Sequence, residues 1–162
     1  MSIDKRPYNI RDIIMLVLYP FFEDFNKSDV FVDVKNFNDS VSVDFETFQI
    51  AIYHIIENMA KYVRPHTDVT ISFLYNKKSL SIIFNMQSVH IEKSEIKDIF
   101  KEGYSGLEAK KSKKDGEGIG MYRAQVLLDL NGGTISVEPE DQYEEAKGIK
   151  YSSNKFIIIL PL

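Results

Sequence analysis

Two strand-like segments lie so close together in the sequence that they constrain the fold strongly. Residues 69–75 and 79–84 are rich in Val, Ile, Leu and Phe, and only Asn76, Lys77 and Lys78 separate them. This spacing predicts a hairpin, in which the two strands are antiparallel. A doubly wound parallel sheet would require helices that alternate with single strands, and the sequence lacks that pattern.

The helices are predicted from the spacing of apolar residues. Residues 9–26 carry apolar side chains at offsets of three and four, which predicts a helix with a kink at Pro20. A second helix is expected over residues 45–63, where it stops before Pro65. A third is expected over residues 119–130, because an Asn-Gly-Gly sequence typical of a helix C-terminus follows it.

Further short elements complete the expected order. Strands are predicted at residues 30–34, 41–43, 134–138 and 155–160, and a short helix capped by Ser94 at residues 94–100. We therefore expect an α+β fold, a two-layer α/β sandwich. Its sheet should be mixed but mostly antiparallel, with helices packed on one face.

Composition narrows the class of protein. The 162 residues suit a single domain, residues 1–162, and the net charge of −4 favours no nucleic-acid or membrane partner. Cysteine is absent, so disulfides and thiolate metal sites are excluded. The longest apolar run, residues 13–22, is too short to span a bilayer, and no signal-peptide pattern opens the chain. We expect a cytoplasmic protein without membrane contact.

A glycine-rich segment precedes the third predicted helix. Residues 116–121 read Gly-Glu-Gly-Ile-Gly-Met, and glycines at a helix N-terminus let backbone N–H groups approach phosphate oxygens. No Gly-Lys-Ser/Thr follows, so this is not a P-loop, and no strand precedes it, as a dinucleotide-binding fold would require. A lysine-rich segment, residues 101–117, comes before it and is predicted to be a mobile loop. A plain turn beside a solvated loop is the alternative.

One side of the second helix is polar. His54, Asn58, Lys61 and Tyr62 are spaced at i, i+4, i+7 and i+8, which places them on one side of the helix. An amide oxygen there could bind Mg²⁺, a lysine could reach a phosphate, and a tyrosine ring could stack on a base. An ordinary solvated helix face is the alternative.

Taken together, these segments resemble the catalytic ATP-binding domain of sensor histidine kinases. That family belongs to the wider gyrase, heat-shock chaperone and MutL ATPase superfamily, which shares the Bergerat fold. Residues 57–62, Glu-Asn-Met-Ala-Lys-Tyr, resemble the family's N box, and residues 98–106 resemble the F box at the start of its ATP lid. Residues 116–122 match the G2 box, and residues 128–137 and 156–161 resemble the elements that close the fold. The match covers nearly the whole chain, with the lid at about residues 101–117.

The resemblance implies ATP and Mg²⁺ as cofactors and a role for each matching residue. Asn58 would bind Mg²⁺, Lys61 would contact a phosphate, Tyr62 would line the adenine pocket, and Phe100 would pack the base of the lid. Including the two amides considered next, the implied nucleotide-binding residues are Asn58, Lys61, Tyr62, Asn85, Gln87, Gly116, Gly118, Ile119, Gly120 and Met121.

The sequence departs from the family where adenine is recognised. Family members usually carry Asp-x-Gly-x-Gly after the hairpin, and the aspartate accepts a hydrogen bond from the adenine amino group. Here Met86 takes the place of the aspartate, or Asn85 if the register shifts by one, and both glycines are replaced. An amide oxygen of Asn85 or Gln87 is the candidate replacement acceptor. Otherwise the site binds ATP weakly, prefers another nucleotide or is vestigial.

His54 stands four residues before Asn58, where hydrolysing relatives carry a general-base glutamate. A neutral imidazole could act as a base near pH 7, so His54 is a candidate catalytic residue. A packed or surface histidine is the alternative. Glu57 is adjacent to Asn58 and points elsewhere, so it is not assigned that role.

Three functions remain open at the level of sequence. The first is a histidine-kinase ATP-binding domain that binds ATP or ADP and transfers a phosphoryl group to a histidine outside this chain. No His-Glu-x-x-Thr-Pro motif is present, so a phosphoacceptor or dimerisation domain would come from the parent chain or a partner protein. The second is a pseudo-kinase that acts as a regulatory or interaction module. The third is an ATP hydrolase switch.

Overall fold

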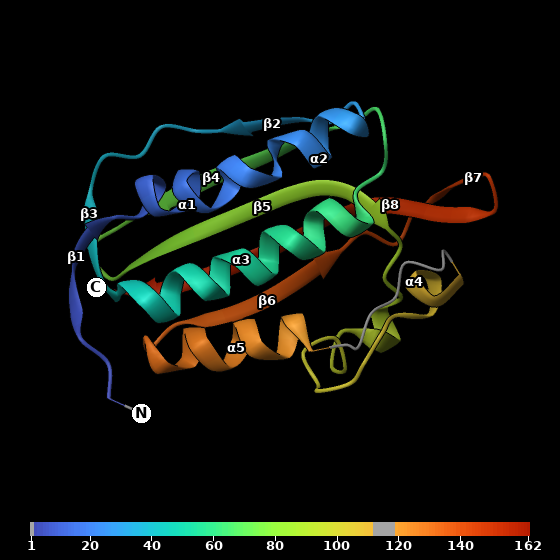
Figure 1. The fold of residues 1–162 in the computed structure, drawn as a ribbon. Helices are drawn as coiled ribbons and strands as arrows, with labels where there is room; N and C mark the ends of the chain where they lie inside the picture. Colours follow the sequence, from blue (N-terminus) through green and yellow to red (C-terminus); the bar gives the residue numbers. More distant parts are fainter. Residues whose placement is uncertain (1, 112–118) are drawn as a thin grey trace.

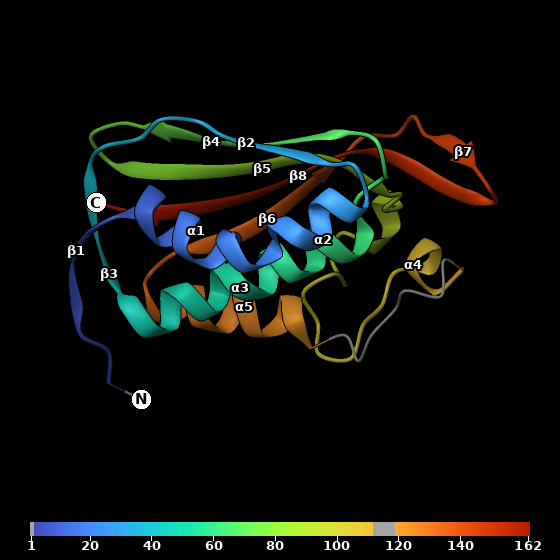
Figure 2. The same cartoon turned by 45° about the horizontal axis from the view of Figure 1, so that its top comes forward.

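The chain forms two layers, a sheet and a group of helices that cover one of its faces (Figures 1 and 2). The computed structural model describes residues 2–111 and 119–162. In chain order the elements are β1 (Lys5–Asn9), α1 (Ile10–Leu18), the 3₁₀ turn η1 (Tyr19–Phe21), α2 (Phe22–Lys27), β2 (Phe31–Val34), β3 (Ser40–Asp44), α3 (Phe45–Tyr62), β4 (Asp68–Tyr75), β5 (Ser79–Val89), the 3₁₀ turn η2 (Lys93–Glu95), α4 (Leu107–Lys111), α5 (Gly120–Leu130), β6 (Thr134–Pro139), β7 (Glu144–Ala146) and β8 (Ile149–Pro161).

The main sheet has the strand order β2-β4-β5-β8-β6, and β7 pairs with β8. Among the described strands, β2 and β4 are parallel and all other pairs are antiparallel. The β4–β5 hairpin turns at Asn76, whose side-chain oxygen accepts hydrogen bonds from the backbone N–H groups of Lys78 and Ser79. The expected α+β sandwich with a mixed, mostly antiparallel sheet is therefore confirmed.

The pairing of β5 with β8 is the longest in the sheet. It runs from Ser79 opposite Pro161 to Val89 opposite Tyr151. The sequence prediction ended the first strand at residue 84 and began the last at residue 155, so it was too short in both. Polar residues that alternate with apolar ones extend both strands, and their burial depends on the partner strand rather than on their own hydropathy.

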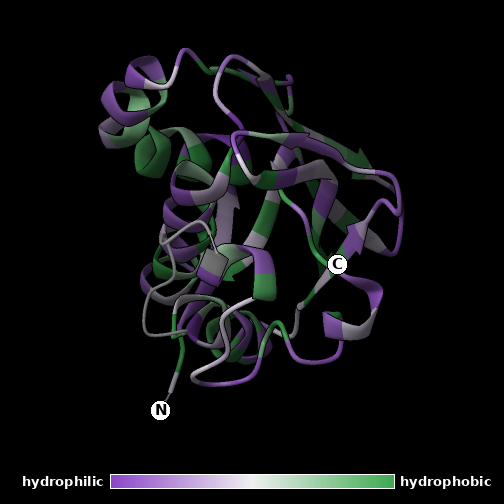
Figure 3. Ribbon diagram, turned by 90° about the vertical axis from the view of Figure 1, so that its right-hand side faces the viewer, coloured by the Kyte–Doolittle hydropathy of each residue, from purple (hydrophilic) through white to green (hydrophobic). Residues whose placement is uncertain are grey.

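The helices bury a continuous apolar face against the sheet. Helix α3 begins at the N-cap Asp44, whose carboxylate accepts a hydrogen bond from the backbone N–H of Thr47 at 3.0 Å. The first predicted helix is present but divided at Pro20, where η1 separates α1 from α2. In Figure 3, hydrophobic and hydrophilic residues alternate along both helices and strands. The core side chains of α3 are Phe48, Ala51, Ile52, Ile55, Ile56 and Met59.

Four short elements differ from the prediction. Strands β1 and β7 were not predicted, because each is a short polar strand whose stability comes from its partner. Helix α4 lies within the segment that was predicted to be a loop. The prediction of a helix capped by Ser94 was wrong. The chain forms η2, capped by Glu92, followed by turns, because Glu92 and Glu95 exchange backbone and side-chain hydrogen bonds in a capping box.

None of the helices in the described ranges is long and apolar enough to cross a bilayer.

The side chain of Asn131 connects the end of α5 to the start of α3. Its side-chain oxygen accepts from the backbone N–H of Asp44 at 2.8 Å, and its amide nitrogen donates to Thr47 Oγ1 and to the carbonyl of Leu127, both at 2.9 Å. The side chain is 1% exposed. It therefore fixes the start of α3 to the end of α5 through three hydrogen bonds.

We predict that Asn131→Ala lowers the free energy of unfolding by about 2–4 kcal/mol, because it leaves buried polar groups of Asp44 and Thr47 without their partner. Urea denaturation followed by circular dichroism measures this change. Asp129→Ala, at an exposed position two residues earlier, is the control and should have almost no effect. A loss below about 1 kcal/mol in Asn131→Ala would contradict the proposed link.

Candidate nucleotide-binding site

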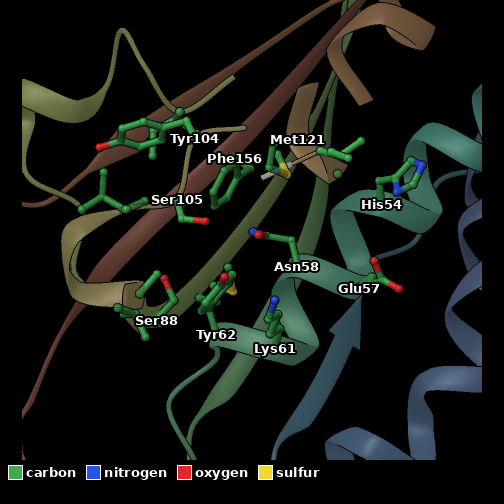
Figure 4. A pocket seen from close by; sticks show the side chains of 18 of the residues that line it. His54, Glu57, Asn58, Lys61, Tyr62, Ser88, Tyr104, Ser105, Met121 and Phe156 are labelled. Atoms are coloured by element: carbon green, nitrogen blue, oxygen red, sulfur yellow. The ribbon is translucent and has the colours of Figure 1, made fainter. Parts of the chain in front are cut away.

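A cavity of about 340 Å³ lies between the second half of α3, the end of β5 and the start of α5. The segment 99–109 forms its remaining wall. This volume is within the range of small-molecule sites. Figure 4 shows the side chains that converge on it.

Helix α3 supplies the polar wall of the cavity. His54, Asn58, Lys61 and Tyr62, which helical spacing placed on one side, all line it. The opposite side of the same helix is in the core. Polar and apolar residues both recur with the helical period but on different sides of α3. One side of the helix therefore packs in the core while the other lines the cavity.

The Asn58 side chain extends into the middle of the cavity (Figure 4). It is half-buried, and the described residues offer its amide no hydrogen-bond partner. The ammonium group of Lys61 lies 5.4 Å from the centroid of the Tyr62 ring. No carboxylate within the described ranges forms a salt bridge with this ammonium group. The amide oxygen and the cation are therefore both available to a ligand.

The N-terminus of α5 faces the same cavity through Ile119, Gly120 and Met121. No side chain in the described part of the chain caps this helix. The first backbone N–H groups of a helix lack acceptors within the helix, so a start without a side-chain cap in the described residues is suitable for an anion. Gly116 and Gly118, the other two predicted glycines, lie outside the described residues.

His54 lies beside the start of α5 with its Nδ1 atom buried and without a hydrogen-bond partner in the described structure. Burial lowers its pKa below the ordinary value of 6.5; the nearby Glu57 opposes this shift, and Arg123 adds to it. The imidazole is therefore neutral at pH 7, as a general base must be.

We predict that the His54 imidazole titrates below pH 6.5, because the folded state disfavours its charged form. As pH falls from neutrality, the unfolded chain takes up this proton first, so His54 reduces stability below about pH 6.5. Chemical shifts of the imidazole in NMR spectra measure the pKa. A His54 pKa above the ordinary value of 6.5 would contradict the burial argument.

Glu57 is at the edge of the cavity but is held by another residue. Tyr53 donates a hydrogen bond from its hydroxyl to the Glu57 carboxylate at 2.8 Å. That hydrogen bond raises the pKa of Tyr53. Glu57 therefore contacts Tyr53 rather than the centre of the cavity.

The end of β5 meets the cavity differently from the prediction. Asn85 and Gln87 are exposed and do not line it; Gln87 contacts Arg64 instead. Met86 and Ser88 line it instead, because side chains in a strand alternate between the two faces, and His90, immediately after β5, lines it as well. Ser88 and His90 were not predicted as cavity residues, because the strand was predicted to end before them and they stand where the family motif has glycines.

The base of the predicted lid is organised by the buried carboxylate of Glu95. It accepts hydrogen bonds from the Tyr104 hydroxyl at 2.6 Å, the backbone N–H of Leu107 at 2.7 Å and the backbone N–H of Glu92 at 2.8 Å. Burial, followed by the bond to Glu95, raises the pKa of Tyr104. Tyr104 thus stays protonated and helps to hold the segment that forms the outer wall.

The donor set fits a magnesium nucleotide. Mg²⁺ is usually held by one or two protein oxygens together with phosphate oxygens, and Asn58 supplies an oxygen beside the α5 N-terminus. No cluster of three acidic or histidine side chains, which would indicate an all-protein metal site, occurs in the described part of the chain. Val89, Ile91, Ile99 and Phe156 add apolar side chains to the lining, which suits a flat base.

The comparisons with known proteins agree with this architecture. Residues 43–162 match the family described as histidine kinase-, DNA gyrase B-, and HSP90-like ATPases. This match covers most of the chain. The fold is thus that of a histidine-kinase catalytic domain, and the chain belongs to this ATPase family.

Individual relatives are distant in sequence. The signal transduction histidine-protein kinase ArlS of Staphylococcus epidermidis is 26% identical over 102 residues, which are 63% of this chain and 22% of that protein. The sensor protein SrrB of Staphylococcus aureus is 21% identical over 99 residues, 61% of this chain and 17% of that protein. The chain therefore matches only about a fifth of the length of these curated relatives.

Solved structures share the fold over nearly the whole chain. The mycobacterial sensor histidine kinase MprB has a TM-score of 0.78 at 18% identity, with 98% of this chain and 97% of that chain covered. Full-length ShkA, solved in complex with AMPPNP, has a TM-score of 0.79 at 13% identity, with 99% of this chain and 32% of that chain covered.

Proposed function

We propose that the chain is the ATP-binding catalytic domain of a sensor histidine kinase acting in the cytoplasm. In this role it binds MgATP and transfers the γ-phosphoryl group to a histidine outside this chain. One observation carries the proposal: the Asn58 amide and the uncapped N-terminus of α5 lie on one cavity. Together they provide a metal ligand and an anion site, which the phosphate end of MgATP requires.

Each group at the phosphate end of the cavity would have a distinct role. Asn58 would hold Mg²⁺, which neutralises phosphate charge when bound. The backbone N–H groups at the start of α5 would donate to phosphate oxygens, and Lys61 would add a cation. Such sites act mainly by positioning the reacting groups and by stabilising charge.

The transfer itself requires an imidazole nitrogen from another domain. The bond between the γ-phosphorus and the bridging oxygen of ADP breaks, and a bond between phosphorus and the imidazole nitrogen forms. ADP leaves with the electron pair, and the imidazole loses its N–H proton to solvent. The chain's own residues would align the triphosphate for this displacement, and the partner domain would bring the acceptor.

We predict that the wild-type chain binds ATP about tenfold more tightly with Mg²⁺ than without it, and that Asn58→Ala abolishes this difference. Titration calorimetry with ATP and ADP, each with and without Mg²⁺, measures it. Asn85→Ala is the matched control, because this asparagine is exposed and lies outside the cavity. An unchanged Mg²⁺ dependence in Asn58→Ala would refute the metal assignment.

We further predict that phosphate from γ-labelled ATP appears on a phosphoacceptor-helix domain supplied separately, as an acid-labile, alkali-stable product typical of phosphohistidine. The chain alone should neither label itself nor release phosphate steadily. Steady release that is lost in His54→Ala would instead identify an ATP hydrolase.

A pseudo-kinase is the second candidate, and Met86 is the observation that favours it. This residue is 2% exposed and lines the cavity where the family resemblance implies an aspartate. A thioether is only a weak acceptor, so Met86 does not replace a carboxylate in hydrogen bonding. Absence of nucleotide binding at millimolar concentration in the calorimetric titration would favour a pseudo-kinase over an active kinase.

A further inference from the structure

A buried polar network lies behind the end of the cavity that would receive the base. On β5, Ser88 is directly opposite Ser152 and diagonally opposite Asn154 of β8, and His90 follows immediately after the end of β5. Residues that face each other across an antiparallel pair project from the same side of the sheet. All four side chains are at most 5% exposed, although two of them, Ser88 and His90, also line the cavity.

The four side chains form a chain of hydrogen bonds. Asn154 Nδ2 donates to Ser88 Oγ at 2.7 Å and to the carbonyl of Ser152 at 3.2 Å. Ser152 Oγ donates to Asn154 Oδ1 at 3.3 Å and lies 2.8 Å from His90 Nδ1. The network therefore links Ser88, at the cavity wall, to His90.

The direction of these bonds follows from the backbone carbonyl of Ser152, which can only accept. It fixes the Asn154 amide with its nitrogen toward Ser88 and its oxygen toward Ser152. Ser152 Oγ and His90 Nδ1 share a hydrogen bond whose direction depends on the imidazole tautomer, and the orientation of the Asn154 amide does not depend on it. At the other end, Ser88 Oγ accepts from Asn154 and keeps its own proton.

The proton of Ser88 has no acceptor among the described residues, and its oxygen retains a second lone pair. In Figure 4, Ser88 lies beside Tyr62, on the other side of Asn58 from Met121. This hydroxyl therefore presents both a donor and an acceptor at the end of the cavity that is remote from the start of α5.

The neighbouring side chain on the same face of β5 is Met86, so β5 supplies no carboxylate beside this hydroxyl. A carboxylate would accept from the amino group at position 6 of adenine and repel the carbonyl oxygen that guanine has there. The hydroxyl of Ser88 can accept from the amino group through its free lone pair or donate to the carbonyl oxygen. One group thus satisfies either purine.

We propose that the cavity binds purine nucleoside triphosphates of both kinds, with Ser88 as the residue that contacts position 6 of the base. Asn154 positions the Ser88 hydroxyl, and Met86 removes the discrimination against guanine. This proposal rests on the proposed function, because it takes the triphosphate to be bound by Asn58 and α5.

The test compares MgATP and MgGTP by titration calorimetry on the whole chain. Wild-type dissociation constants within about tenfold of each other support the proposal. Ser88→Ala should weaken both nucleotides by about five- to tenfold, and Met86→Asp should favour ATP over GTP by at least about tenfold. Ser153→Ala is the matched control, because the side chain of Ser153 projects from the opposite face of β8, and it should change neither affinity.

Two results would overturn the proposal in different ways. If ATP binds more than about tenfold tighter than GTP, or if Ser88→Ala changes neither affinity, the inference about the base fails and the kinase proposal stands. If neither triphosphate binds at millimolar concentration, the proposed function itself fails. The wild-type comparison needs no variant, so it decides the question even if Ser88→Ala or Met86→Asp does not fold; thermal unfolding of each variant shows whether it does.

Discussion

The antiparallel pairing of β5 with β8 is the constraint on which the rest of the structure depends. It extends over the whole length of β5, from Ser79 to Val89. Its first half supplies buried apolar side chains beneath α3, and its second half supplies one wall of the cavity. Because the register of a strand determines which residues share a face, a shift by one residue would exchange Met86 and Ser88 for Asn85 and Gln87.

The features that could be predicted from the sequence depend on residues close together in the chain. The polar side of α3 was one of these, because helical spacing alone places Asn58 four residues after His54 on the same side. The family resemblance added the expected magnesium ligand and the start of α5. In each case the order of residues within one segment was sufficient for the prediction. The structure brings these segments to one cavity.

The base end could not be predicted, because its polar contacts join distant strands. Asn154 donates to Ser88 across 66 residues of sequence. Taken separately, each is an ordinary polar residue with no motif. The strand prediction also stopped at residue 84, because Asn85 and Gln87 interrupt the apolar run. Their side chains are exposed, and backbone pairing with β8 continues the strand through them; that pairing cannot be read from one segment alone.

The Glu95 carboxylate has a consequence for the entropy of the cavity wall. It fastens Glu92 to Leu107 within a single hydrogen-bonded set, so the intervening residues form a closed loop. Closing a flexible loop of that length costs conformational entropy, which grows only slowly with the number of residues. Here the chain's own carboxylate holds the loop, so the entropy of closing it is lost during folding. The part of the cavity wall between Glu92 and Leu107 is therefore already ordered when a ligand enters. Less conformational entropy is lost on binding, so the affinity is higher.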